Sequence, residues 1–357
     1  LEKIRPQLEY DSIFGELLMQ YPIVLGYYFN LGTADNVKAG ALPLPTIFSD
    51  EVSIKAGSVV EGTGYGSNIA VLTDAALAAG HFNPIVDPDG LIRKVPLLLK
   101  FEGDYFESLS LAVFRMFKAL EGAEASGKAL SVQPLVLFDE AGEVVTGEGS
   151  SVLNAIQVAD KRIPVGPDSS VFVSYQGPQK TFTYLSFDDL VEGRIPPEAL
   201  KDKVVLVGTT APGLSDSRST PMGELYPGVE VHANVLASLL SERASAMPWR
   251  PIEFRFLEPL GIFVCTIFLL LVLGRVSPLA SMGVWLSLSL ATLLGGGYLW
   301  TGYQVVPQIA PLLGAITSIF LWNFAYQFYA EHKKKAQFTD LFGQYVPPEL
   351  VEKMAED

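Results

Sequence analysis

The sequence predicts two parts of different fold class: an α/β domain with a mixed sheet over residues 1–252 and an all-α bundle of three apolar helices over residues 253–330. A short helical segment follows at 331–357. The first observation behind this division is the charge distribution. The chain carries a net charge of −14, yet between residues 256 and 329 only Glu258 and Arg275 are charged. The second is that β-branched runs alternate with amphipathic helical patterns upstream of residue 253.

The elements of the α/β domain follow from these local patterns. Asp87-Pro-Asp-Gly90 has Pro in its second position and Gly in its fourth, which is typical of a tight turn, so we expect a hairpin between the apolar runs on either side. The run KVVLVG predicts a buried strand. The expected helices are 12–20, 69–79, 109–120, 187–192 and 231–240, and the expected strands are 23–29, 82–86, 91–99, 171–175 and 203–208.

Three apolar stretches predict membrane-spanning helices at about 256–273, 276–300 and 305–329. A helix needs about 20 apolar residues to cross the hydrocarbon core, and these stretches meet that length. The alternative, buried helices of a globular protein, is disfavoured because the loops between them are also almost free of charge. Pro307 and Pro311 are expected to kink the third helix or to delay its start.

Charge also indicates the orientation of these helices. The basic run from Lys333 to Lys335 follows the third stretch, and Arg275 lies between the first two, whereas residues 301–304 carry no charge. By the positive-inside rule the acidic α/β domain lies outside the cell or in the periplasm, and residues 331–357 lie in the cytoplasm. Arg250 and Arg255 count weakly against this orientation. We therefore expect a multi-pass protein of the inner (cytoplasmic) membrane with the lipid bilayer as a partner, and the acidic composition argues against a nucleic-acid partner.

The end of the expected strand 203–208 is the best candidate for a ligand site. Ligands of open α/β sheets bind beyond the carboxyl ends of strands, and small or hydroxyl residues follow this one. The candidate ligand-binding residues are Thr209, Thr210, Asp216, His232 and Asn234. The alternative is that they only make packing and hydrogen-bond contacts. No nucleotide-binding loop, metal-spaced cluster or catalytic triad is present, so no catalytic residue, metal ligand or cofactor is predicted within this chain.

Several segments resemble one family of sensor domains. The hairpin segment from Gly80 to Leu97, the tetrapeptide Tyr175-Gln-Gly-Pro178, and the stretch from KVVLVGTTA to PGVEVHAN resemble the second type of CHASE domain, the cyclase- and kinase-associated extracellular sensing domain. The resemblance covers residues 1 to about 250. It implies an extracytoplasmic sensor with an unknown ligand. Since that family begins with a membrane anchor and the sequence starts at Leu1, we expect a fragment that lacks the N-terminal anchor and the catalytic domain.

The C-terminal tail is similar to the coupling segment that precedes the catalytic domain of class III adenylate/guanylate cyclases. Its apolar residues recur at helical spacing, and Pro347-Pro348 break the pattern before a new helix. The expected coupling residues are Phe338, Leu341, Phe342, Tyr345, Pro348 and Glu349. The resemblance implies a homodimeric receptor-type cyclase that uses Mg²⁺ or Mn²⁺ in its catalytic domain. Two alternatives are the sensor region of a histidine or serine/threonine kinase and a non-enzymatic membrane scaffold.

Overall fold

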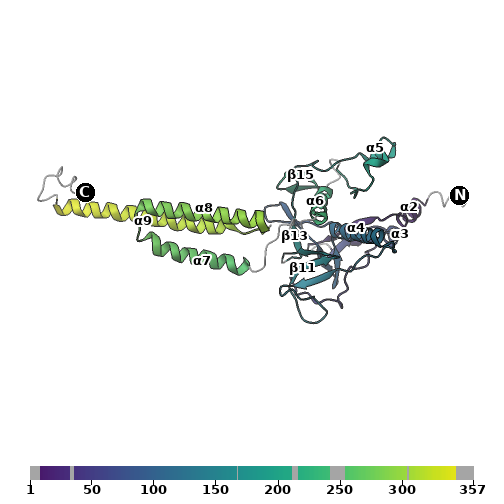
Figure 1. The fold of residues 1–357 in the computed structure, drawn as a ribbon, viewed down its shortest axis with the longest axis horizontal. Coiled ribbons are helices and arrows are strands. Elements are labelled where there is room, and N and C mark those ends of the chain that lie inside the picture. Colours follow the sequence, from purple (N-terminus) through teal and green to yellow (C-terminus); the bar gives the residue numbers. More distant parts are fainter. Residues whose placement is uncertain are drawn as a thin grey trace. The chain divides into compact units, whose positions relative to one another are not determined.

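The computed structural model describes residues 9–32, 36–166, 168–210, 216–241, 254–303 and 305–342, apart from the side chains of Arg255 and of eight residues near the end of the last helix. The chain divides into two compact units, Leu1–Trp249 and Arg250–Asp357 (Figure 1). The first is a mixed α/β domain with several small sheets, and the second consists of long apolar helices. Both fold classes agree with the sequence prediction.

The first sheet contains both parallel and antiparallel pairs. Helix α2 (Tyr10–Leu18) leads into β1 (Val24–Asn30), and the sheet order is β2-β4-β1-β5. Strand β5 (Ala78–His81) pairs with β1 in parallel, whereas β4 (Gly64–Gly66) pairs with it antiparallel and β2 (Lys38–Ala39) pairs with β4. The helix predicted at 69–79 is shorter than expected. Only α3 (Ala70–Ala75) is helical, because the chain then extends to form β5.

Three further sheets contribute buried residues to the largest hydrophobic core of this unit. The predicted hairpin is present: β6 (Ile85–Val86) and β7 (Ile92–Pro96) are antiparallel, and Gly90 N–H donates to Asp87 O at 2.8 Å. Arg93 contacts both Asp87 and Asp89 across this turn. Strand β13 (Ser170–Phe172) pairs with β7. The other two sheets are β3 (Val60–Glu61), β8 (Leu98–Phe101) and β9 (Asp104–Glu107), and β10 (Val136–Asp139), β11 (Leu153–Val158) and β12 (Lys161–Pro164).

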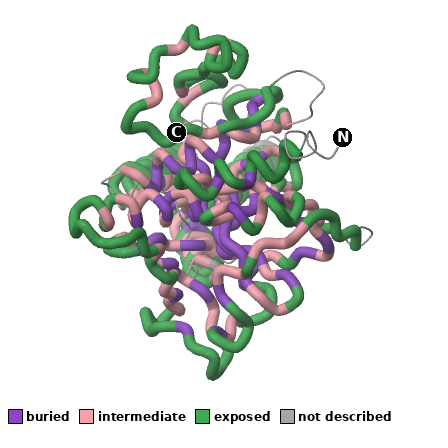
Figure 2. The backbone as a smooth tube through the Cα atoms, turned by 90° about the vertical axis from the view of Figure 1, so that its right-hand side faces the viewer, coloured by how far each residue is buried: buried purple, intermediate pink, exposed green. Residues whose placement is uncertain are grey.

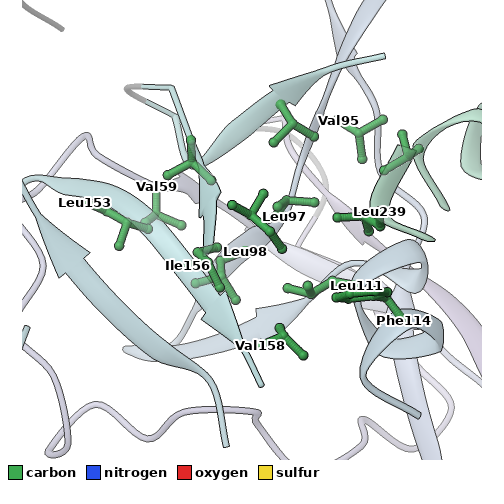
Figure 3. Packing of buried hydrophobic residues seen from close by; sticks show 14 of the residues in the cluster. Val59, Val95, Leu97, Leu98, Leu111, Phe114, Leu153, Ile156, Val158 and Leu239 are labelled. Carbon is green, nitrogen blue, oxygen red and sulfur yellow. The ribbon is translucent and has the colours of Figure 1, made fainter. Parts of the chain in front are cut away.

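Helices α4 (Leu109–Ser126) and α6 (Gly228–Leu240) pack together on this core. Helix α4 starts at the N-cap Ser108, whose hydroxyl accepts from Leu111 N, and ends at Gly127, whose φ of 64° is a left-handed C-cap. Leu239 of α6 lies with Leu111 and Phe114 of α4 among strand residues (Figure 3). Buried positions gather at the centre of the unit (Figure 2).

One predicted strand is absent. Residues 203–208 form no strand, and within the described chain no backbone hydrogen bond joins them to a neighbour. Val205 is 53% exposed and Val207 is 83% exposed, whereas Leu206 packs on the core. The prediction of a buried strand there was wrong, because a β-branched run favours an extended backbone but burial requires a neighbouring strand. In the sequence, residues 203–208 follow α5 (Phe187–Val191) and the short 3₁₀ helix Pro197–Ala199. They precede the hairpin of β14 (Ser217–Thr220) and β15 (Gly223–Pro227).

The second unit contains α7 (Phe254–Leu273), α8 (Pro278–Tyr303) and α9 (Ile309–Phe342). Among the residues that the structure describes, three segments are long and apolar enough to cross a membrane: Phe256–Leu273, Pro278–Tyr303 and Ile309–Ala330, with mean hydropathies of 2.5, 1.5 and 1.5. Helix α9 begins after Pro307, which agrees with the expected late start. It then continues as one helix through the basic run to Phe342.

Candidate functional site

Polar side chains at the start of α6 attach a long surface segment to the domain. Asn234 is fully buried; its Oδ1 accepts from Gln176 N at 2.7 Å, and its Nδ2 donates to Tyr226 Oη at 2.8 Å and to Glu230 O at 2.7 Å. One turn earlier, Glu230 accepts from Tyr184 Oη at 2.6 Å and from Lys180 N at 3.2 Å. These bonds fix the loop that starts at Gln176 against α6.

The attachment includes a buried acidic side chain, Glu230. It is 2% exposed, and within the described residues its Oε1 has no hydrogen-bond partner. Burial, together with the Glu230 carboxylate, raises the pKa of the Tyr184 phenol. A neutral phenol is therefore the donor to a buried carboxylate. Such a bond is stronger than one between two neutral groups.

Two buried histidines lie inside the domain. His232 Nδ1 is 2.9 Å from Ser110 Oγ on α4, and its Nε2 is 3.4 Å from Phe82 O. His81, at the end of β5, is fully buried, and neither of its ring nitrogens has a partner within the described residues. Burial lowers the pKa of His232 to about 4, and burial together with the nearby His232 ring lowers the pKa of His81 to about 3. Both rings are neutral near pH 7.

A buried ion pair lies next to this region. Glu107, the last residue of β9, accepts from Arg115 Nη2 of α4 at 2.6 Å, and the glutamate is 2% exposed. Burial raises the pKa of Glu107 to about 7, although Arg115 acts in the opposite direction. Removal of either partner would leave a charge without compensation in the interior.

The other end of α6 is held by a lysine. Lys161 Nζ donates to Leu239 O at 2.5 Å and to Ser241 O at 2.7 Å, and it lies 5.8 Å from the Phe114 ring centroid. The last carbonyls of a helix have no intrahelical partner, and a cation there also complements the helix dipole. Helix α6 is thus fixed at both ends, and it is the last described helix before the apolar unit.

Three of the five predicted ligand-binding residues, Asp216, His232 and Asn234, lie on or next to α6. Asp216 lies at the start of α6, where its O accepts from Gly228 N at 2.8 Å. Thr209 and Thr210 are exposed, whereas His232 and Asn234 are buried and engaged within the domain. The contacts of the last two favour the structural alternative, and ligand binding by all five residues stays a prediction.

Sequence reasoning missed the buried residues Glu230, Glu107 and His81. Glu230 carried a usable signal, because it directly precedes the helix predicted at 231–240 and lies within the apolar pattern of PGVEVHAN. Within the described residues no group of three or more His, Cys, Asp and Glu side chains is placed to hold a metal ion.

The predicted coupling residues fall at the limit of the described chain. Phe338, Leu341 and Phe342 belong to α9, but their side chains are not among those described. Tyr345, Pro348 and Glu349 lie outside the described residues. The backbone of α9 does connect the third apolar segment with the first of these positions without interruption.

A large mixed α/β domain joined to three helices that can cross a membrane defines a multi-pass membrane protein. The CHASE2 domain family matches residues 4–274, which is more than two thirds of the chain. The chain belongs to the CHASE2 family, and it therefore contains a sensor domain of the extracytoplasmic type. Neither the comparison with curated proteins nor that with solved structures gave a match.

Proposed function

We propose that this chain is the sensory and membrane region of a receptor-type adenylate/guanylate cyclase in the inner membrane. Its CHASE2 domain detects an extracytoplasmic ligand, and its third membrane helix transmits the signal to cyclic nucleotide synthesis in the cytoplasm. The catalytic domain, with Mg²⁺ or Mn²⁺, belongs to the full-length protein.

The observation that carries the proposal is the continuity of α9. This helix extends from Ile309 in the third membrane segment to Phe342, within the tail that is similar to a cyclase coupling segment. A continuous helix transmits rotation or axial displacement along its length, because its backbone hydrogen bonds resist local unwinding. The tail stripe that starts at Phe338 would pack on the same segment of a second copy in a homodimer.

The runner-up function is the sensor region of a kinase, since the same sensor and helices can precede either output. The tail favours the cyclase, because its stripe and double proline are similar to the cyclase coupling segment and not to a generic linker.

The experiment is to express the native protein that contains this chain in a bacterial host lacking its own adenylate cyclase. Membranes are assayed with ATP and with GTP, each with Mg²⁺ and with Mn²⁺. We expect cyclic AMP or cyclic GMP to form. Transfer of the γ-phosphate to the protein itself without any cyclic nucleotide would replace the cyclase proposal by the kinase.

A further inference from the structure

One face of α9 packs against the rest of the helical unit, and its character changes along the helix. Leu312, Ile316 and Ile319 lie in the small apolar core with Leu269 and Leu273 of α7. The next positions on this face are Asn323 and Gln327. Both are half-buried, whereas Tyr326 beside them is 65% exposed. Amide side chains thus replace apolar ones where α7 ends.

Gln327 binds the end of α7 and the turn that follows it. Its two Nε2 N–H groups donate to Leu273 O and to Asn323 Oδ1, each at 2.8 Å, and Val276 O shares one of them at 3.3 Å. Leu273 is the last residue of α7, so its carbonyl has no partner within its own helix. One side chain of α9 therefore satisfies two backbone carbonyls from outside its helix.

The two helices are also joined at their opposite ends. Gln308 N–H, just before α9, donates to Glu258 Oε1 of α7 at 2.8 Å. Helix α9 is thereby held along its membrane segment, whereas its continuation beyond Ala330 is a plain extension of the same helix. Phe342 lies 15 residues beyond Gln327, about 22 Å along the axis at 1.5 Å per residue.

The Gln327 amide uses its nitrogen as a hydrogen-bond donor, but its oxygen accepts no bond from the described residues. Its Oε1 is buried and has no partner within the described residues. A rotated or shifted α9 that paired this oxygen would compete with the observed arrangement. Two settings of one helix that differ by a few hydrogen bonds are what a switch requires.

We propose that Asn323 and Gln327 form a polar clamp that fixes the rotation and depth of α9 against the end of α7, and that this setting determines the resting activity of the output domain. The inference rests on the proposed function, since an output domain must follow α9. Gln327 is a positioning residue, which acts on the output through the helix. Signal transfer consists of the release of this clamp.

The test uses the full-length protein in nanodiscs, with Cys265→Ala and spin labels on Leu279→Cys and Gln337→Cys. These positions report α9 relative to the start of α8. Gln327→Leu removes the donor while keeping a similar volume, and Gln327→Asn keeps an amide on a shorter side chain. Tyr326→Leu changes the neighbouring exposed residue and serves as the matched control.

We expect one distance in the parent and in the control, a second distance in Gln327→Leu, and an intermediate result in Gln327→Asn. Cyclic nucleotide formation without stimulus, measured without the labels, should change in Gln327→Leu about fivefold or more, the low end of allosteric coupling. An unchanged distance in both Gln327 variants overturns the clamp, as does a second distance with unchanged resting activity. Absence of cyclase activity from the parent itself would refute the proposed function instead, and the distances would still decide whether the clamp exists.

Discussion

Asn234→Ala should destabilise the sensor domain strongly, because the side chain makes three short hydrogen bonds at a fully buried position. Each bond contributes about 1 kcal/mol net, and the loss of the donor to Tyr226, which is 1% exposed, leaves a buried hydroxyl without that partner. The expected loss in the free energy of unfolding is therefore about 3–4 kcal/mol. At about 2–4 °C per kcal/mol for a domain of this size, the melting temperature falls by about 10 °C.

Pulse proteolysis in increasing urea is a suitable assay, because it reports the sensor domain while the helices remain in nanodiscs. Ser238→Ala is the matched control. Ser238 lies one turn further along α6 and is 3% exposed, and its hydroxyl donates to Asn234 O at 3.0 Å. It should cost less than about 1 kcal/mol, since that carbonyl keeps its helical partner. Equal stability of the two variants would refute the conclusion that Asn234 anchors the loop at Gln176.

Three further predictions concern the cap, pH and topology. Lys161→Met should lower the free energy of unfolding by about 1–2 kcal/mol, because the last carbonyls of α6 lose a charged donor; the same urea series measures this, and an unchanged midpoint contradicts the capping role. Below pH 6.5 both histidines bind a proton in the unfolded chain, but in the folded domain His232 stays neutral down to about pH 4 and His81 down to about pH 3, so acid destabilises the fold. Glu107 acts in the opposite direction, because it binds its proton below about pH 7 in the fold and only at lower pH in the unfolded chain. Its contribution cancels that of one histidine. Unfolding at pH 6, 5.5 and 5 should thus show a net loss of up to about 1.4 kcal/mol per pH unit, and His232→Gln should abolish that slope; an equal slope in the variant would contradict it. In the Cys265→Ala background, Gly147→Cys in intact spheroplasts should react with an impermeant thiol reagent while Gln337→Cys should not, and the reverse pattern would overturn the orientation.

Local chemistry explains which elements were predictable. The hairpin at Asp87–Gly90 was correct because the turn depends only on its own residues, and Gly90 N–H does bond to Asp87 O. The helices around Leu109 and Phe187 and the membrane segments also follow from local periodicity and composition. The strand at 203–208 was wrong, since pairing depends on which chain segment lies beside it. The pattern of Val and Leu residues carries no information about that neighbour.

The candidate site was less predictable than the fold. His232 and Asn234 were chosen because they stand at a helix start, and the structure places both on α6 as expected. Polarity alone does not distinguish a side chain that faces a ligand from one that faces the interior. The partners decide this, and Ser110 and Gln176 come from 122 and 58 residues away in sequence.

Because α9 is continuous, the number of residues after the membrane segment sets the direction in which the following residues face around the helix axis. One residue inserted between Lys335 and Phe338 would turn everything beyond it by about 100°, whereas seven would restore the original direction almost completely, about 10 Å further along the axis. A receptor that transmits rotation would then respond periodically to insertions, and one that transmits axial displacement would respond to their length. A series of insertions after Lys335 would thus distinguish rotation of α9 from its axial displacement.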